Sequence, residues 1–145
     1  KLKHDNTRDW IAWQNKNFAI HILRELNTLD DKAIFSSKKM TLEFAVGYEK
    51  MQSLGIGTLH FHKDRIVVQG DKTIVLPLEN ISALTAQFKE RIELFYEDTA
   101  YRFTSATEKE SGMKWEIAIN TAWKVSGQHL KISPSFKELM SDIHA

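Results

Sequence analysis

The sequence predicts a single domain of the α+β class, mainly β, in which about seven antiparallel strands form a partly open barrel capped by a C-terminal helix. Three observations lead to this prediction. Apolar and polar residues alternate over short runs between residues 40 and 105. The connections between these runs are too short for the crossovers that parallel strands need. An apolar pattern with helical spacing, containing Trp115, follows the last run.

An extra helix is expected before the strands, from about residue 6 to residue 29. Asn6 and Thr7 can cap its start, and neither Gly nor Pro interrupts the segment. Its apolar residues cover more than one stripe, and such a helix is normally buried on more than one side. Asp30, Asp31 and Lys32 then indicate a turn.

The middle of the chain alternates with the period of two that is typical of strands. In an early run Leu42 and Phe44 alternate with more polar neighbours, and in the last run Tyr101 and Phe103 do the same. Gly and charged turn residues separate the runs and favour an antiparallel meander. The expected strands cover residues 40–48, 55–62, 65–70, 72–78, 82–88, 91–97 and 100–105.

Helical spacing returns after the polar stretch 107–112. Trp115 and Ile119 fall on one face of this helix, and Gly127 is a natural stop. A last short helix is expected over 135–143. The expected organisation is therefore an N-terminal helical extension over 1–38, the main domain over 39–127, and a short helical tail over 128–145 packed on the same domain.

Length and composition narrow the class of protein. A chain of 145 residues is expected to form one domain. A net charge of +1 creates no global field that would recruit nucleic acid. The absence of Cys excludes disulfides and thiol chemistry. Because the sequence begins with Lys1 rather than Met, we expect it to be a piece of a longer protein.

Six short stretches, in their order along the chain, carry a resemblance to known domains: residues 57–61, 65–68, 76–81, 91–96, 101–103 and 114–119. With these stretches, residues 40–126 resemble the pleckstrin-homology superfold, and the finer pattern resembles GRAM domains and their bacterial relatives. The resemblance implies two near-orthogonal sheets with an open corner that the terminal helix plugs.

Four basic residues near the predicted hairpins are candidate lipid head-group ligands: Lys50, Lys63, Arg65 and Lys72. Phosphoinositide-binding members of the superfold place Lys and Arg around the first hairpin, where they hold phosphates by charge-assisted bonds. This sequence departs from that pattern, because its first loop has a single Lys that Glu49 balances. For these four residues the favoured interpretation is therefore solvated charge that prevents edge strands from pairing, and lipid binding is the alternative.

His60 and His62 lie two positions apart on a predicted strand, so both are expected on the face opposite Leu59 and Phe61. Two imidazoles at this spacing can bind a metal, and Asp64 could be a third ligand. The favoured interpretation is that both imidazoles face solvent. We therefore expect no metal site.

The aromatic residues have two interpretations each. Trp115 is expected to plug the core, the alternative being an exposed ligand platform. Trp10 and Trp13 either dock on the sheet, which is favoured, or mark a surface that meets another part of the parent protein. Met51 and Leu54 in the first loop either dip into a bilayer surface or pack under the hairpin.

No catalytic motif is present. The sequence has no G-x-S-x-G, no glycine-rich phosphate loop and no H-E-x-x-H, and most of its carboxylates fall in turns or on polar strand faces. The expected function is a non-catalytic cytoplasmic module without a cofactor, which associates with anionic lipid or a membrane surface and not with nucleic acid. The alternative is a module that takes up a peptide or a neighbouring domain, either in the groove between the last helix and the sheet or along an edge strand.

Overall fold

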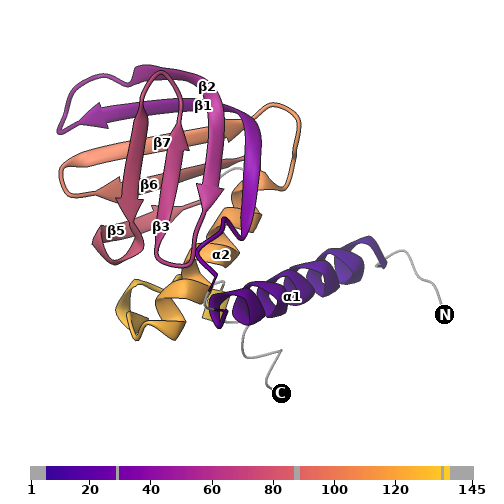
Figure 1. The fold of residues 1–145 in the computed structure, drawn as a ribbon. Helices are drawn as coiled ribbons and strands as arrows, with labels where there is room; N and C mark the ends of the chain where they lie inside the picture. The colour runs from indigo at the N-terminus through magenta and orange to yellow at the C-terminus, as the bar shows by residue number, and fades with distance from the viewer. Residues whose placement is uncertain (1–5, 29, 87–88, 135, 138–145) are drawn as a thin grey trace.

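The computed structural model describes residues 6–28, 30–86, 89–134 and 136–137, and of residues 6–12 it describes the backbone alone. The predicted fold class is confirmed: seven antiparallel strands form a half-barrel, with one long helix before them and one after them (Figure 1). The elements are α1 (Asn6–Leu26), β1 (Phe35–Val46), β2 (Gln52–Phe61), β3 (Arg65–Gln69), β4 (Thr73–Pro77), the 3-10 turn η1 (Leu78–Asn80), β5 (Ile81–Thr85), β6 (Arg91–Tyr96), β7 (Thr99–Ser105), α2 (Ser111–Val125) and the 3-10 turn η2 (His129–Lys131).

The strands form one continuous sheet in the order β4-β3-β2-β1-β7-β6-β5. The long strand β1 joins the two halves, because its first part pairs with β2 and its second part pairs with β7. In Figure 1 the strands β5 to β7 cross behind β2 to β4 at a steep angle. The sheet therefore curls without closing, and β4 and β5 are its two edges.

The first strand begins five residues earlier than the alternation predicted. A register shift separates Ser37 from Met40, and Lys39 between them has a φ of 56°. Such a bulge breaks the period of two, and Ser37 and Met40 are both buried as a result. The strand predicted over 82–88 ends at Thr85, and residues 87–88 lie outside the described residues.

The predicted core plug is confirmed. Trp115 on α2 is 1% exposed, and its ring lies 4.7 Å from that of Phe35 and 5.9 Å from that of Phe61 between centroids. Its indole Nε1–H donates a 2.9 Å hydrogen bond to Ser37 Oγ, which satisfies the buried donor. The helix therefore closes one end of the half-barrel, here called the closed end.

A second indole lies where the sheet is interrupted. No ladder joins β4 to β5, and η1 spans the gap between them. Trp123 on α2 is fully buried, and its Nε1–H donates a 3.0 Å hydrogen bond to the backbone oxygen of Leu78 in η1. We call this junction the seam. The side chain of Trp123 therefore links α2 to the seam.

The helix α1 docks along part of its length. Ala19 and Ile22 are fully buried, and the ring of Phe18 meets that of Phe35 edge-on at 5.5 Å. Trp13 is 54% exposed, and Figure 1 shows this half of α1 running away from the barrel. The C-terminal half of α1 therefore packs on the domain, whereas Trp13 does not dock on the sheet as predicted. The side chain of Trp10 is not among those that the structure describes.

The described residues that follow α2 turn back onto it. Gly127, with a φ of 83°, follows the end of that helix as predicted. Ser133 N donates to Asn120 Oδ1 at 2.9 Å, and Phe136 is buried. Most of the helix predicted over 135–143 lies outside the described residues. Within the described part of the chain, no helix has the length and apolar character needed to cross a bilayer.

Candidate functional site

A groove of about 810 Å³ lies at the closed end. It is bounded by the turn between β2 and β3, by η1, and by the C-terminal end of α2. Leu78 and Ala122 supply apolar surface, and charged side chains of both signs surround it. The groove is lined by Lys63, Asp64, Arg65, Pro77, Leu78, Glu79, Ala122, Ser126 and Gln128.

Hydrogen bonds fix the walls of the groove. Leu78 N donates to the backbone oxygen of Asp64 at 2.9 Å, which ties η1 to the β2–β3 turn. Lys131 Nζ donates to the backbone oxygen of Glu79 at 2.7 Å and lies 5.6 Å from the centroid of the Trp123 ring. Burial lowers the pKa of Lys131, and the charge of Glu79 opposes that shift. The groove is therefore formed by segments that are connected to one another.

The guanidinium of Arg65 is the most strongly paired group of the groove. Its Nη1 donates to Asp64 Oδ1 at 2.7 Å, and its Nη1 and Nη2 donate to the two carboxylate oxygens of Asp31 at 3.1 and 3.3 Å. The hydrogen bond from Arg65 holds the pKa of Asp31 below its usual value. The bonds to Asp31 and Asp64 raise the pKa of Arg65.

The four predicted lipid ligands separate into two pairs. Lys63 and Arg65 belong to the β2–β3 turn at the closed end, whereas Lys50 and Lys72 belong to turns at the opposite end, here called the open end. The five residues of β3 separate the two turns by about 16 Å. A single head group cannot bridge this distance. The role of all four in lipid binding stays a prediction.

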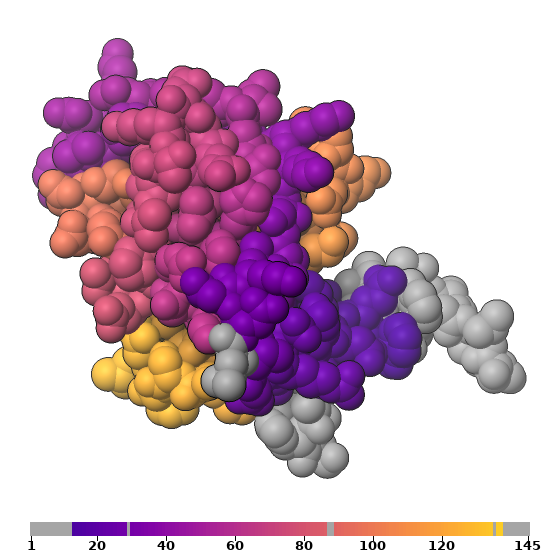
Figure 2. Space-filling model, in the orientation of Figure 1, coloured from indigo at the N-terminus to yellow at the C-terminus, as the bar shows by residue number. Residues whose placement is uncertain are grey.

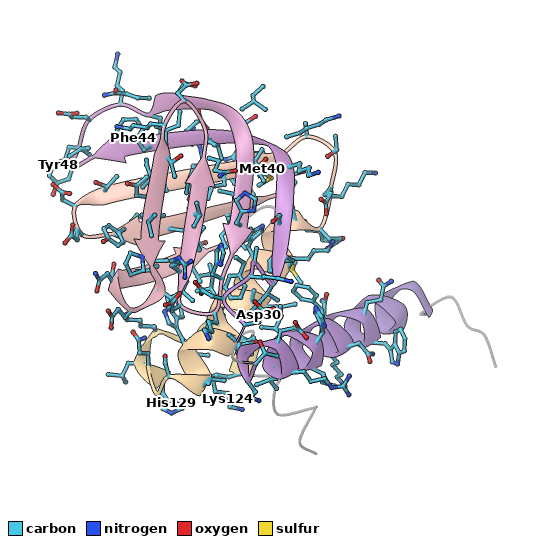
Figure 3. The ribbon with its side chains drawn as sticks, in the orientation of Figure 1. Asp30, Met40, Phe44, Tyr48, Lys124 and His129 are labelled. Atoms are coloured by element: carbon cyan, nitrogen blue, oxygen red, sulfur yellow. The ribbon has the colours of Figure 1, made fainter. Side chains whose placement is uncertain are left out.

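The open end holds a smaller cavity, of about 220 Å³. Lys72 Nζ lies 5.9 Å from the centroid of the Phe44 ring at its edge. Tyr48 in the adjoining β1–β2 loop is fully exposed, and Figure 3 shows Phe44 and Tyr48 at the end of the sheet opposite Lys124 and His129. The cavity is lined by Phe44, Val46, Leu54, Lys72, Ile74, Thr99 and Tyr101.

The charge of the open end is unfavourable for anionic lipid. The loop that contains Lys50 also contains Glu49, and the turn that contains Lys72 also contains Asp71. The turn between β6 and β7 adds two further carboxylates, Glu97 and Asp98, and the backbone oxygen of Asp98 accepts a hydrogen bond from the β1–β2 loop. Leu54 packs inside the barrel, while Met51 is half-buried. Of the two alternatives for this loop, packing therefore holds for Leu54.

The two histidines do not form a pair. His60 Nδ1 lies 2.6 Å from Ser36 Oγ, and its Nε2 lies 2.8 Å from Gln69 Oε1. His62 follows the end of β2, and its Nδ1 lies 3.0 Å from the backbone oxygen of Asp31. Each imidazole thus has partners of its own. Among the described residues, no three His, Cys, Asp or Glu side chains gather as metal ligands.

Sequence reasoning missed Asp31 as a partner of Arg65 and missed most of the groove lining. Asp31 was interpreted only as part of a turn, and it lies 34 positions from Arg65. The only sequence-based indication of this site was the general expectation of a groove between the last helix and the sheet. The groove of the structure adjoins that helix, but it lies at the β2–β3 turn and η1.

The strand order, with α2 following the last strand, is the arrangement that the resemblance led us to expect. No family model matches the sequence. No curated protein matches it either. Among solved structures, the chain is similar to the solution structure of the N-terminal PH domain of human ARAP2, with 17% sequence identity and a TM-score of 0.45 over 63% of this chain and 81% of that domain.

Proposed function

We propose that this chain is a non-catalytic binding module, and that the groove at the closed end takes up a short peptide segment of a partner protein. The observation that carries the proposal is the groove of about 810 Å³ between the β2–β3 turn and the end of α2. The GRAM-type pattern over residues 40–126 is part of the same proposal, but a fold does not assign a function, so the proposal depends on the groove.

The chemistry of the lining supports a peptide. Lys63 and Arg65 lie on one side with Asp64 between them, and Glu79 adds a second carboxylate. A peptide with charged, polar and apolar side chains matches this mixed lining.

A displayed peptide library supplies the probe for a direct test. Selected peptides are synthesised and titrated into the ¹⁵N-labelled chain. We expect the largest amide shifts in residues 63–65, 77–79 and 122–128. Glu79→Arg should change the dissociation constant by about fivefold, which corresponds to about 1 kcal/mol.

Glu49→Arg is the matched control, because it reverses the same charge at the open end and should leave binding unchanged. Equal effects of the two variants would contradict the proposal. A library that yields no peptide that binds in solution would contradict it too, as would peptides that shift only the edges β4 and β5.

A second candidate is peripheral membrane association, and one observation favours it. Tyr48 is fully exposed in the β1–β2 loop, two positions before Lys50. An aromatic side chain with a polar end is suited to a membrane interface. The four carboxylates of the open end oppose binding to anionic lipid. We therefore place this candidate second.

Vesicle co-sedimentation tests the membrane candidate. Vesicles of phosphatidylcholine with phosphatidylserine are used at two salt concentrations, with the wild type, Tyr48→Ala and Lys50→Ala with Lys72→Ala. Salt-sensitive pelleting that either variant weakens would support it. The absence of pelleting at low salt would reject it.

A further inference from the structure

The described residues between α1 and β1, 27–28 and 30–34, cover the basic β2–β3 turn. Figure 2 shows this segment, in purple, lying over the end of the magenta strands. Lys63 Nζ reaches the backbone oxygen of Thr28 at 3.5 Å, and Ile34 N donates to the backbone oxygen of Phe61 at 2.7 Å. The segment, here called the linker, therefore contacts the turn at several points.

The carboxylate of Asp31 holds the position that a bound oxyanion would take. Two parallel N–H···O bonds join its oxygens to the guanidinium of Arg65, and this forked geometry is the one in which Arg binds carboxylate or phosphate groups of ligands. Lys63 and the ring of His62 lie in the same turn and face the same linker. The linker thus supplies an anion to a cluster of basic side chains.

This internal anion is held at the surface. The Asp31 side chain is 64% exposed, whereas that of Arg65 is 28% exposed. Exposed ion pairs contribute little net free energy, so a competing anion can replace the carboxylate at small cost. Asp64 binds the same guanidinium from the adjacent position and keeps it oriented towards the groove.

We propose that Arg65, with Lys63, is an oxyanion subsite of the groove, that Asp31 occupies this subsite in the free protein, and that a carboxylate or phosphate group of the ligand displaces it. The inference rests on the proposed function, since it names the chemistry of one part of the same groove. The ligand is then a peptide with an acidic or phosphorylated side chain next to an apolar one.

Displacement of Asp31 is coupled to α1. The linker leads directly from α1 to β1, and the fully buried side chains of Ala19 and Ile22 hold α1 on the domain. Release of the linker removes one of the attachments of the helix. By thermodynamic reciprocity, whatever loosens α1 then strengthens anion binding, and anion binding loosens α1.

The test uses inorganic phosphate and, in a second arm, acetate, each titrated into the full 145-residue chain and followed by the NMR signals of the Arg65 side chain and of the linker amides. Asp31→Asn should lower the dissociation constant for phosphate by roughly threefold to tenfold, because the internal competitor is lost. The acetate arm shows whether a carboxylate suffices or a phosphate is required.

Asp30→Asn is the matched control, since it removes the same charge one residue away and its carboxylate does not contact Arg65 in the described structure. It should change the affinity much less than Asp31→Asn does. A second readout is amide hydrogen exchange over residues 19–26, which phosphate should accelerate in the wild type. In Asp31→Asn the exchange should already be fast.

If Asp31→Asn and Asp30→Asn raise the affinity for phosphate equally, the effect comes from net charge alone, and the inference is overturned. The absence of any phosphate or acetate signal at Arg65 in all three proteins would overturn it as well. Because free anions need no peptide, anion binding at Arg65 without peptide binding rejects the proposed function alone. Peptide binding that is insensitive to Asp31→Asn rejects this inference alone.

Discussion

The two ends of the half-barrel differ in how they are covered. At the closed end, Trp115 and the linker fill or cover the surface, and the groove is formed by segments from three parts of the chain. At the open end, the cavity is smaller and Tyr48 extends into solvent. The turns of the open end are also bonded to one another, for example by Gly47 N to the backbone oxygen of Asp98, but no helix or linker covers them. Substitutions at the two ends should therefore differ in their cost.

The largest effect is expected from Trp115→Ala. The side chain is buried among aromatic rings, so its loss leaves a large cavity and should lower the free energy of unfolding by about 3–5 kcal/mol. Trp13→Ala removes the same side chain from an exposed position and should cost less than about 1 kcal/mol. Urea unfolding followed by circular dichroism measures both. Similar losses would contradict the assignment of Trp115 as the plug.

Substitution of glycine by alanine should lower the free energy of unfolding by different amounts at Gly112 and at Gly47. A Cβ on Gly112, at the start of α2, would lie 2.3 Å from the backbone oxygen of Arg91 and 2.8 Å from that of Lys89. These are backbone atoms, so the helix must shift, and we expect a loss of about 1–3 kcal/mol. Gly47 at the open end has free space around it and a φ of 57°, so Gly47→Ala should cost only about 1 kcal/mol. Thermal unfolding of both variants checks the order.

The two ends should also govern opposite sides of the pH profile of stability. Asp31 has a lowered pKa because Arg65 donates hydrogen bonds to it, so its contribution is present above about pH 4 and is lost as the pH falls through the lowered value. The advantage of the wild type over Asp31→Asn should therefore shrink with acidification. Urea titrations at pH 7, 4 and 3 test this.

At the open end, burial raises the pKa of Tyr101, and the charges of Tyr96, Asp98 and Glu97 act in the same direction. The unfolded chain then loses this proton before the folded one does. The stability contributed by neutral Tyr101 is present below about pH 10 and decreases as the pH rises towards the raised value. Tyr101→Phe should abolish that decrease, and unfolding experiments between pH 9 and 11 would show whether it does.

The smallest effect is expected from Tyr48→Ala. The side chain is fully exposed, so its removal should change the free energy of unfolding by less than about 0.5 kcal/mol. A larger loss would mean that the loop packs on the barrel. The same variant serves the vesicle experiment, where an unchanged stability allows any loss of binding to be assigned to the tyrosine itself.

The strands could be predicted because one face of each is buried, which leaves a period of two in the sequence. Prediction failed where that period breaks, at the bulge of Lys39, and the start of β1 at Phe35 was missed for that reason. The helix with Trp115 was visible because its apolar residues follow the helical period. The end of α1, at Leu26, differs from the predicted end by three residues.

The groove could not be predicted in detail from the sequence. Its walls come from segments as distant as Lys63 and Gln128, and no local pattern records that folding brings them together. The pairing of Asp31 with Arg65 is a long-range contact of the same kind. The basic residues were visible as charges, but the placement of Lys50 and Lys72 at the other end depends on the strand order.

The seam between β4 and β5, where Trp123 lies, has a consequence for slow motions. Strand hydrogen bonds are absent between β4 and β5, so thermal breathing of the sheet should begin there, and deuterium should enter the outer amides of these two strands before those of β1. Because η1 belongs both to the seam and to the groove wall, such breathing also changes the width of the groove. A molecule held across the groove would therefore slow deuterium uptake at a place it does not touch.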